Sequence, residues 1–141
     1  AEALDQPAQA IAVLDRLVRL RPGEASPVAS RGILRARLGQ FKPAFDDAQS
    51  ASNLSPGGRE QLQIAGIYAL VADQRPTQSN SVEPKPGELR SQAYTWLARA
   101  IQSDNSMVSL AANDPDLASL RTSPQFKRLI GGASLIQATA K

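Results

Sequence analysis

The sequence contains no cysteine and no histidine among its 141 residues. Disulfide bonds and thiolate metal sites are therefore excluded, and so is most zinc chemistry, since zinc in proteins is held chiefly by Cys and His. Histidine is also the commonest general base and the usual partner of an activated nucleophile. These two absences favour a protein without catalysis and predict no cofactor.

Aromatic residues and long apolar runs are also scarce. Only six side chains are aromatic, whereas 42% of the residues are hydrophobic and many of these are alanines. Small side chains let helices approach closely, while β-sandwiches favour β-branched and aromatic residues, so we expect an all-α fold. No run reaches the roughly 18 apolar residues of a membrane-spanning helix, and the amino terminus lacks a signal-peptide pattern. We therefore expect no membrane contact from this segment and a cytoplasmic location.

The charge is nearly balanced, with 16 basic and 13 acidic side chains and a net charge of +3. Nucleic-acid-binding domains usually concentrate far more positive charge. Several arginines nevertheless lie along the expected helices and could neutralise phosphates: Arg16, Arg19, Arg31, Arg35, Arg37 and Arg59. Acidic residues are interleaved with them and aromatic stacking platforms are few, so an electrostatic nucleic-acid-binding helical domain is the less favoured alternative.

A 34-residue repeat is the most informative pattern in the chain. A Leu-x-Pro motif at 20–22 returns at 54–56, and other residues recur at the same spacing. The paired positions include Leu20 and Leu54, Pro22 and Pro56, Gly32 and Gly66, and Ile33 and Ile67. This period is typical of solenoids built from pairs of antiparallel helices. The pattern predicts a helical stack, an architecture whose extended surfaces commonly bind other proteins.

Apolar periodicity and turn residues delimit the expected helices, which cover residues 7–20, 26–39, 42–54, 59–73 and 89–103. Pro7, Pro27 and Pro43 fall in first turns, where the missing N–H costs nothing, and Ser26 is the expected N-cap of the second helix. The fourth helix is apolar over much of its circumference, so we expect it at the centre of the fold.

Residues 74–88 interrupt the pattern, with three prolines among polar residues. Such a composition cannot bury enough apolar surface to offset its ordering entropy. Removing these 15 positions restores the repeat register, because Ala44 and Ala48 then correspond to Ala93 and Leu97. We therefore expect a flexible loop inserted into a third repeat. It is either a docking or modification tether, through its Thr and Ser residues, or a passive surface loop.

The segment 104–130 is expected to form short helical pieces that cap the stack. Asp114 precedes Pro115 and Ser123 precedes Pro124, and both pairs are typical of helix starts. The residues expected to cover the last repeat are Leu117, Leu120, Phe126, Leu129 and Ile130. Residues 131–141 are small and polar, and we expect them to form a flexible tail.

Residues 25–58 resemble a tetratricopeptide repeat. The matching positions are Gly32 in the first helix, Gly39 in the turn, Phe41 after it, Ala44 and Ala51 in the second helix, and Pro56 at the end. The resemblance implies an α-α superhelix in one domain spanning 1–130, with a half repeat at 5–24, a full repeat at 25–58 and an interrupted one at 59–103. Arg35 and Ala48 depart from the family, which often has aromatic residues there.

The segment 114–126 resembles the closing motif of repeat arrays in large bacterial proteins. Some of those arrays lie at the carboxy-terminal end of serine/threonine protein kinases, particularly planctomycete ones. The resemblance implies that this chain is a carboxy-terminal part of a larger protein, with such a kinase as one candidate parent. The chain itself has no glycine-rich phosphate loop, no His-Arg-Asp catalytic loop and no Asp-Phe-Gly motif.

The family resemblance also implies a concave binding face lined by the first helix of each repeat. Its candidate residues are Ser26, Ala29, Ile33, Ala36, Arg37, Glu60, Gln63, Ile67, Leu70 and Val71. The apolar members could instead pack against another repeat. Arg31 precedes Gly32 as in repeats whose arginine pairs with an acid of the second helix, so we expect a structural salt bridge between Arg31 and Asp47.

Carboxylate pairs at 46–47 and 114–116 are the remaining candidates for acid–base or calcium chemistry. Adjacent acids on a helix point in different directions, and acids beside a proline more often cap a helix, so we assign no catalytic, cofactor or metal site. The predicted function is a non-catalytic protein–protein interaction module that binds a protein or peptide segment, in another chain or in its own parent. The alternatives are a structural end-cap or spacer of a longer array, and the nucleic-acid-binding domain.

Overall fold

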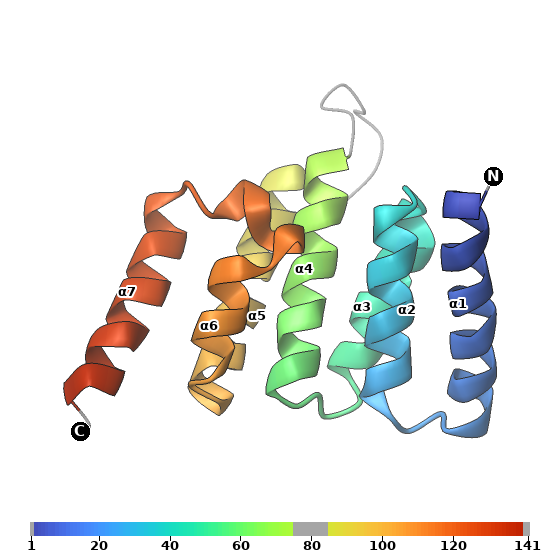
Figure 1. Ribbon diagram of the computed structural model, residues 1–141, viewed down its shortest axis with the longest axis horizontal. Coiled ribbons are helices and arrows are strands. Elements are labelled where there is room, and N and C mark those ends of the chain that lie inside the picture. The colour runs from blue at the N-terminus through green and yellow to red at the C-terminus, as the bar shows by residue number, and fades with distance from the viewer. Residues whose placement is uncertain (1, 75–84, 140–141) are drawn as a thin grey trace.

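The computed structural model describes the backbone of residues 2–74 and 85–139 and the side chains of residues 6–74 and 85–132. This part of the chain is helical and contains no β-strand, which confirms the all-α expectation. Its elements are α1 (Glu2–Leu20), α2 (Ala25–Arg37), α3 (Phe41–Ser52), α4 (Gly58–Gln74), α5 (Pro86–Ser103), α6 (Met107–Asn113), the 3-10 helix η1 (Pro115–Leu120) and α7 (Pro124–Thr139) (Figure 1). Within the described residues, none of these helices combines the length and apolar character needed to cross a bilayer.

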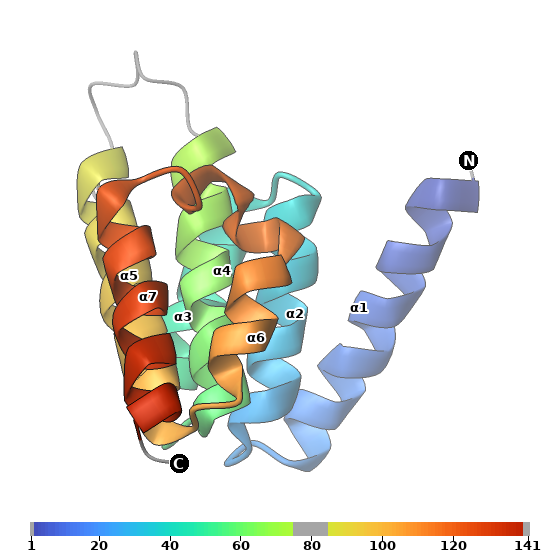
Figure 2. The same cartoon turned by 60° about the vertical axis from the view of Figure 1, so that its left-hand side comes forward.

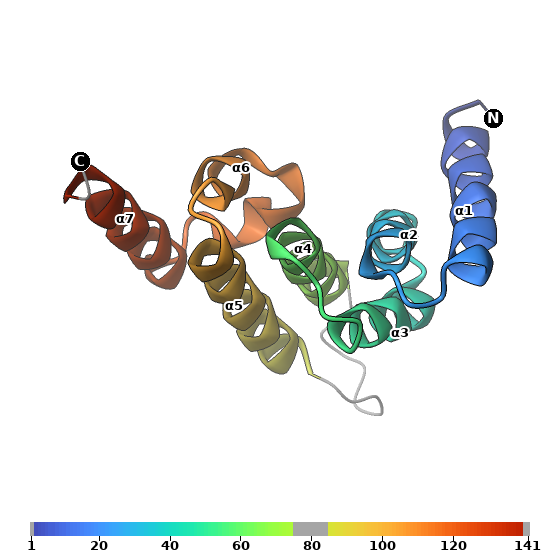
Figure 3. The same cartoon turned by 90° about the horizontal axis from the view of Figure 1, so that it is seen from below.

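The central helices pack as antiparallel neighbours in two rows. In Figure 1, α2, α4 and α6 lie in front of α3 and α5, and Figure 3 shows the same rows from below. α2 packs chiefly against α3, and α4 chiefly against α5. α4 also contacts α2, α3, α6 and η1, and nine of its residues are buried. The expectation that this helix forms the centre of the fold is therefore confirmed.

The first helix, α1, is the least embedded. It packs mainly on α2, and none of its described side chains is buried. Ile11, Leu14 and Leu17 are half-buried on that contact, whereas Val13 and Leu20 are exposed. Figure 2 shows its amino-terminal end standing away from the other helices. The attachment of α1 therefore depends on one face of α2.

Two helix starts differ from the expected ones. α1 begins at Glu2, so Pro7 lies inside the helix and not in its first turn. Proline removes one backbone hydrogen bond at such a position, and α1 continues through that loss. α2 begins at Ala25 with Glu24 as its N-cap residue, so Ser26 is not the cap. Pro27 then falls at the third helical position, where an N–H would have no intrahelical partner anyway.

The helices on both sides of the expected loop extend into the range 74–88. α4 continues to Gln74, and α5 begins at Pro86. Proline suits the first turn of a helix, and the Glu88 carboxylate accepts a hydrogen bond from the Lys85 amide at 3.3 Å. Residues 75–84, on which the tether and passive-loop interpretations depend, lie outside the described residues.

The region after α5 forms the expected helical pieces, α6, η1 and α7. The Asp114 carboxylate caps η1 by accepting a hydrogen bond from the Asp116 amide at 2.9 Å. The Ser123 hydroxyl accepts one from the Phe126 amide at 3.1 Å, in the first turn of α7. Both predicted cap-and-proline starts are therefore confirmed. The buried apolar residues of η1 and α7 are Leu117, Leu120 and Phe126.

The last helix is longer than the sequence suggested. α7 continues through Gly131 and Gly132 to Thr139. The expectation of a flexible tail that begins at residue 131 is therefore wrong for the backbone up to residue 139. A glycine inside a helix costs only about 1 kcal/mol relative to alanine, which does not by itself end a helix. Residues 140 and 141 lie outside the described residues.

Candidate binding groove

A groove of about 410 Å³ lies between α2, α4, α6 and η1, in the front row of Figure 1. α2 forms one side and α6 the other, with α4 between them. The lining residues are Ile33, Arg37, Arg59, Leu62, Gln63, Ser109, Leu110, Asn113, Asp114 and Asp116. Grooves that bind ligands typically combine an apolar lining with a few polar groups that fix orientation, and this one has both.

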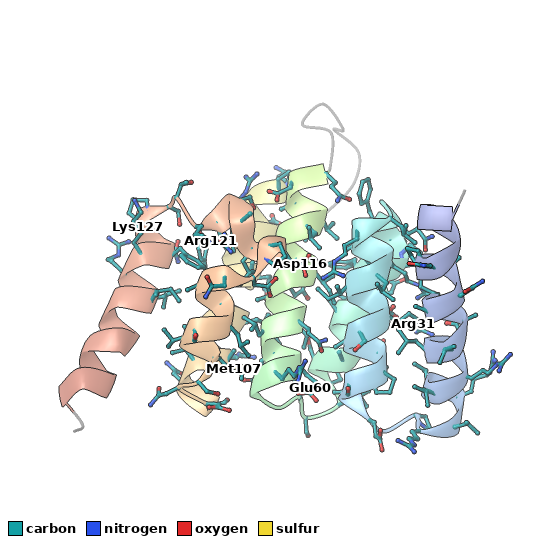
Figure 4. The ribbon with its side chains drawn as sticks, in the orientation of Figure 1. Arg31, Glu60, Met107, Asp116, Arg121 and Lys127 are labelled. Carbon is teal, nitrogen blue, oxygen red and sulfur yellow. The ribbon has the colours of Figure 1, made fainter. Side chains whose placement is uncertain are left out.

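An ion pair closes the groove at η1. The Arg37 guanidinium on α2 donates to both carboxylate oxygens of Asp116, at 3.0 Å from Nε and 2.7 Å from Nη2. These two residues are separated by 79 positions, so the pair fixes η1 against α2. Figure 4 shows Asp116 in front of α4. The hydrogen bonds that Arg37 donates to the Asp116 carboxylate raise the pKa of Arg37. Burial of the neighbouring Asp114 raises the pKa of its carboxyl group.

The middle of the groove is apolar. Ile33 and Leu62 are buried beneath it, while Leu110 on α6 keeps 49% of its surface exposed. Beside them, Gln63 donates a long hydrogen bond to Ser30, at 3.4 Å. Arg59 has no ion-pair partner among the described residues. The groove thus offers an exposed aliphatic contact next to an uncompensated positive charge.

The ten residues predicted for a concave binding face lie in three different environments: in the groove, on the surface outside it, and in the core. Three of them, Ile33, Arg37 and Gln63, line the groove. Ser26 is exposed outside it, and Glu60 and Leu70 are half-buried outside it. The other four are buried in the core and have no surface to offer a partner: Ala29, Ala36, Ile67 and Val71. For these four, the expectation of a binding face is corrected, because packing in the helical core leaves their side chains at most 3% exposed.

The other wall of the groove was not predicted. It comes from α6 and η1, through Ser109, Leu110, Asn113, Asp114 and Asp116. Sequence reasoning assigned this region only the role of covering the end of the stack. Leu110 could have indicated this wall, because it is an apolar residue that lies off the face of α6 that buries its neighbours Val108 and Ala111.

The predicted pair of Arg31 and Asp47 is present and belongs to a larger network away from the groove. Arg31 donates to both oxygens of the buried Asp47 carboxylate, at 3.1 and 2.8 Å, and to Asp15 on α1 at 2.9 Å. Arg35 donates a further hydrogen bond to Asp47, at 3.0 Å. Figure 4 shows Arg31 between α2 and α1. Hydrogen bonding to Asp47 raises the pKa of Arg31. The network connects α1, α2 and α3.

Half of the arginines that suggested nucleic-acid binding are engaged in these ion pairs. Arg31 and Arg35 face Asp15 and Asp47, and Arg37 faces Asp116. Their charge is therefore compensated within the chain. Across the described residues, no three or more Asp or Glu side chains gather into a group that could hold a metal ion.

Comparison with known proteins finds no match: no family model, curated protein or solved structure is significantly similar to this chain. The functional assignment therefore depends on the groove and on the residues that the sequence contributes to it.

Proposed function

We propose that this chain is a non-catalytic protein-interaction module that binds a segment of another protein, or of its own parent, in the groove between α2, α4 and α6. In this proposal the helix pairs form a tetratricopeptide-like superhelix that serves as a rigid scaffold. A large bacterial protein, such as a serine/threonine kinase with a carboxy-terminal repeat array, is the proposed parent, on the resemblance of residues 114–126.

The exposed Leu110 beside the buried Ile33 and Leu62 is the observation that carries the proposal. Binding sites typically place an apolar anchor at the centre and polar groups at the rim. Here the rim holds the side chains of Gln63, Asn113 and Arg59, and Arg59 has no ion-pair partner in the part of the chain that the structure describes. A ligand with one aliphatic anchor and a nearby carboxylate would therefore complement the groove.

Affinity capture from the native lysate tests the proposal, with nuclease added and captured proteins identified by mass spectrometry. The decisive variant is Leu110→Glu, which places a charge in the apolar centre. Leu20→Glu is a matched control, since Leu20 is 76% exposed on α1, outside the groove. We expect a nuclease-resistant partner that is retained by Leu20→Glu and lost by Leu110→Glu, with both variants folded by circular dichroism.

The alternatives give different results. A structural end-cap or spacer would capture no specific partner. Nucleic-acid binding would give captured proteins that disappear with nuclease and an affinity that falls steeply with salt. The internal compensation of Arg31, Arg35 and Arg37 supports the protein-binding proposal over this second alternative.

A further inference from the structure

The first helix, α1, has the same position in the 34-residue repeat as α3, but it has fewer helical neighbours. α3 packs against the helix before it, α2, and against the helix after it, α4. α1 packs mainly against the helix after it, α2. In Figure 1 it lies at the end of the row, with no other described helix beyond it. One side of α1 is therefore open to a further helix.

A comparison of equivalent positions shows the effect of this difference. The buried residues of α3 are Ala44, Asp47, Ala48 and Ala51. Their counterparts on α1, 34 positions earlier, are half-buried or exposed: Ala10, Val13, Leu14 and Leu17. The α1 set is the more apolar of the two, so its accessibility reflects the smaller number of neighbouring helices and not a polar character of this side.

Val13 has the repeat position of Asp47, and Asp47 lies where α2 covers α3. Arg31 and Arg35 of α2 donate hydrogen bonds to the Asp47 carboxylate, at 2.8 and 3.0 Å. A β-carbon on Gly32 of the same helix would stand 3.0 Å from the Asp47 β-carbon. Val13 is 56% exposed and has no polar atom in its side chain. A helix that covered α1 as α2 covers α3 would therefore present an apolar residue to Val13, where α2 presents arginines to Asp47.

The open side of α1 also carries positive charge. Its exposed residues in the last three turns of the helix are Ala12, Val13, Arg16, Arg19 and Leu20, and none of them is acidic. Arg16 and Arg19 form no ion pair among the described residues. Asp15, the one acid of these turns, pairs with Arg31 of α2 at 2.9 Å. Interfaces place opposite charges against each other, so the complementary surface is acidic.

We propose that the open side of α1 binds an acidic amphipathic helix of a partner protein. The aliphatic stripe of that helix would cover Val13, Leu17 and Leu20, the last of which is 76% exposed on α1. Its Asp or Glu side chains, on the flank of the stripe, would pair with Arg16 and Arg19.

The charges of α1 argue against two other occupants. If the carboxy-terminal halves of α1 from two copies met, arginine would lie against arginine, and Asp15 is already paired within its own chain. An anionic lipid surface could attract the arginines, but Val13 and Leu20 offer it little apolar area to insert. The site lies outside the groove between α2, α4 and α6, so this proposal is independent of the function proposed above.

Fluorescence anisotropy with a labelled synthetic helix tests this proposal. The probe repeats the heptad Glu-Leu-Ala-Ala-Leu-Glu-Ala, which places a leucine stripe between glutamates, and the control probe has lysine in place of each glutamate. We expect saturable binding of the glutamate probe and binding of the lysine probe that is about tenfold weaker or less. The bound glutamate probe should slow amide hydrogen exchange in α1 and leave exchange in α6 unchanged, because only α1 gains a neighbour.

Three variants identify the contacts. Val13→Glu should weaken binding of the glutamate probe about tenfold, because it places a charge against the leucine stripe. Leu110→Glu is the matched control, since it changes an aliphatic residue of similar exposure, 49%, in the groove and should leave the affinity unchanged. Arg16→Glu should weaken binding of the glutamate probe about threefold to tenfold and strengthen binding of the lysine probe.

The proposal is overturned if the glutamate probe does not bind, if Val13→Glu binds it as tightly as the unmodified chain, or if Arg16→Glu leaves the preference between the probes unchanged. Two further results would also overturn it by giving this side of α1 to another occupant. One is a dimer in sedimentation equilibrium that Val13→Glu dissociates. The other is binding to phosphatidylserine vesicles, but not to the glutamate probe, that Val13→Glu abolishes.

Discussion

The Cδ1 methyl of Ile67 lies so close to Gly32 that a β-carbon on Gly32 would stand only 2.6 Å from it. The reverse contact joins the same two helices, since a β-carbon on Gly66 would stand 3.1 Å from Cδ1 of Ile33. Gly32 on α2 and Gly66 on α4 thus each receive the isoleucine that follows the other glycine. The 34-residue repeat of Gly-Ile produces this reciprocal packing, because equivalent positions meet where the helices cross.

Gly32→Ala should destabilise the fold by about 1–2 kcal/mol. The new methyl would also lie 3.0 Å from the Asp47 β-carbon, so Ile67 cannot relieve the overlap alone, and overpacking outweighs the gain in helix propensity. Urea denaturation followed by circular dichroism measures the change.

Gly66→Ala introduces the same methyl group with a smaller steric overlap, since its β-carbon would stand 3.1 Å from Cδ1 of Ile33. It should therefore lower the free energy of unfolding by less than Gly32→Ala does. Gly131→Ala is the control for propensity, since nothing lies within 4 Å of its β-carbon position, and it should stabilise by about 0.5–1 kcal/mol. Equal effects at Gly32 and Gly66 would contradict the packing described.

Asp47→Asn should destabilise by about 2–3 kcal/mol, because it leaves Arg31 and Arg35 without their shared buried carboxylate. The adjacent Asp46 is the matched control. It pairs with Lys42 at 2.8 Å, but 79% of the Lys42 side chain and 52% of the Asp46 side chain are exposed. Asp46→Asn should therefore change the free energy of unfolding by no more than about 0.5 kcal/mol. Comparable losses in the two variants would argue against the network.

Asp15→Asn should loosen α1 without unfolding the rest of the chain. α1 has no buried described side chain, and Asp15 connects it to Arg31 at 2.9 Å. Amide hydrogen exchange should become about threefold to fivefold faster in α1 and stay unchanged in α4. Glu24→Gln is the control, because the contact between Glu24 and Arg21 is exposed and 3.7 Å long. Unchanged exchange in α1 would mean that apolar contacts alone hold it.

Tyr68 should ionise at unusually high pH, because its burial raises its pKa above the ordinary 10.0. Tyr94→Phe leaves Tyr68 as the one tyrosine of the chain, so the ultraviolet absorbance of tyrosinate then reports on it alone. The folded state holds this proton more tightly than the unfolded state. Its contribution to stability is therefore complete below pH 10.0 and is lost as the pH rises beyond that value. A midpoint at or below 10.0 would show that Tyr68 is solvated.

Sequence reasoning succeeded where the signal was local. Asp114 and Ser123 cap the helices that begin at the prolines after them, because a cap needs only a neighbouring side chain and two or three amides. It failed at Pro7 and Gly131, where the local signal suggested a boundary and the helix continues. A single unfavourable residue costs a helix only a few kcal/mol at most, and the turns on either side can support it.

The sequence by itself determined the helices, their 34-residue spacing, and the small residues that let α2 and α4 approach. Only the tertiary structure decided which surfaces stay free. Ile67 is buried because α4 meets α2 at Gly32, while Leu110 lines a groove between α2, α4, α6 and η1, where the pair of Asp116 and Arg37 joins η1 to α2. The periodicity of apolar residues indicates which side of a helix is apolar. Whether those side chains are exposed depends on which distant helix covers that side. That choice follows from contacts between residues as far apart as 79 positions, which no local pattern contains.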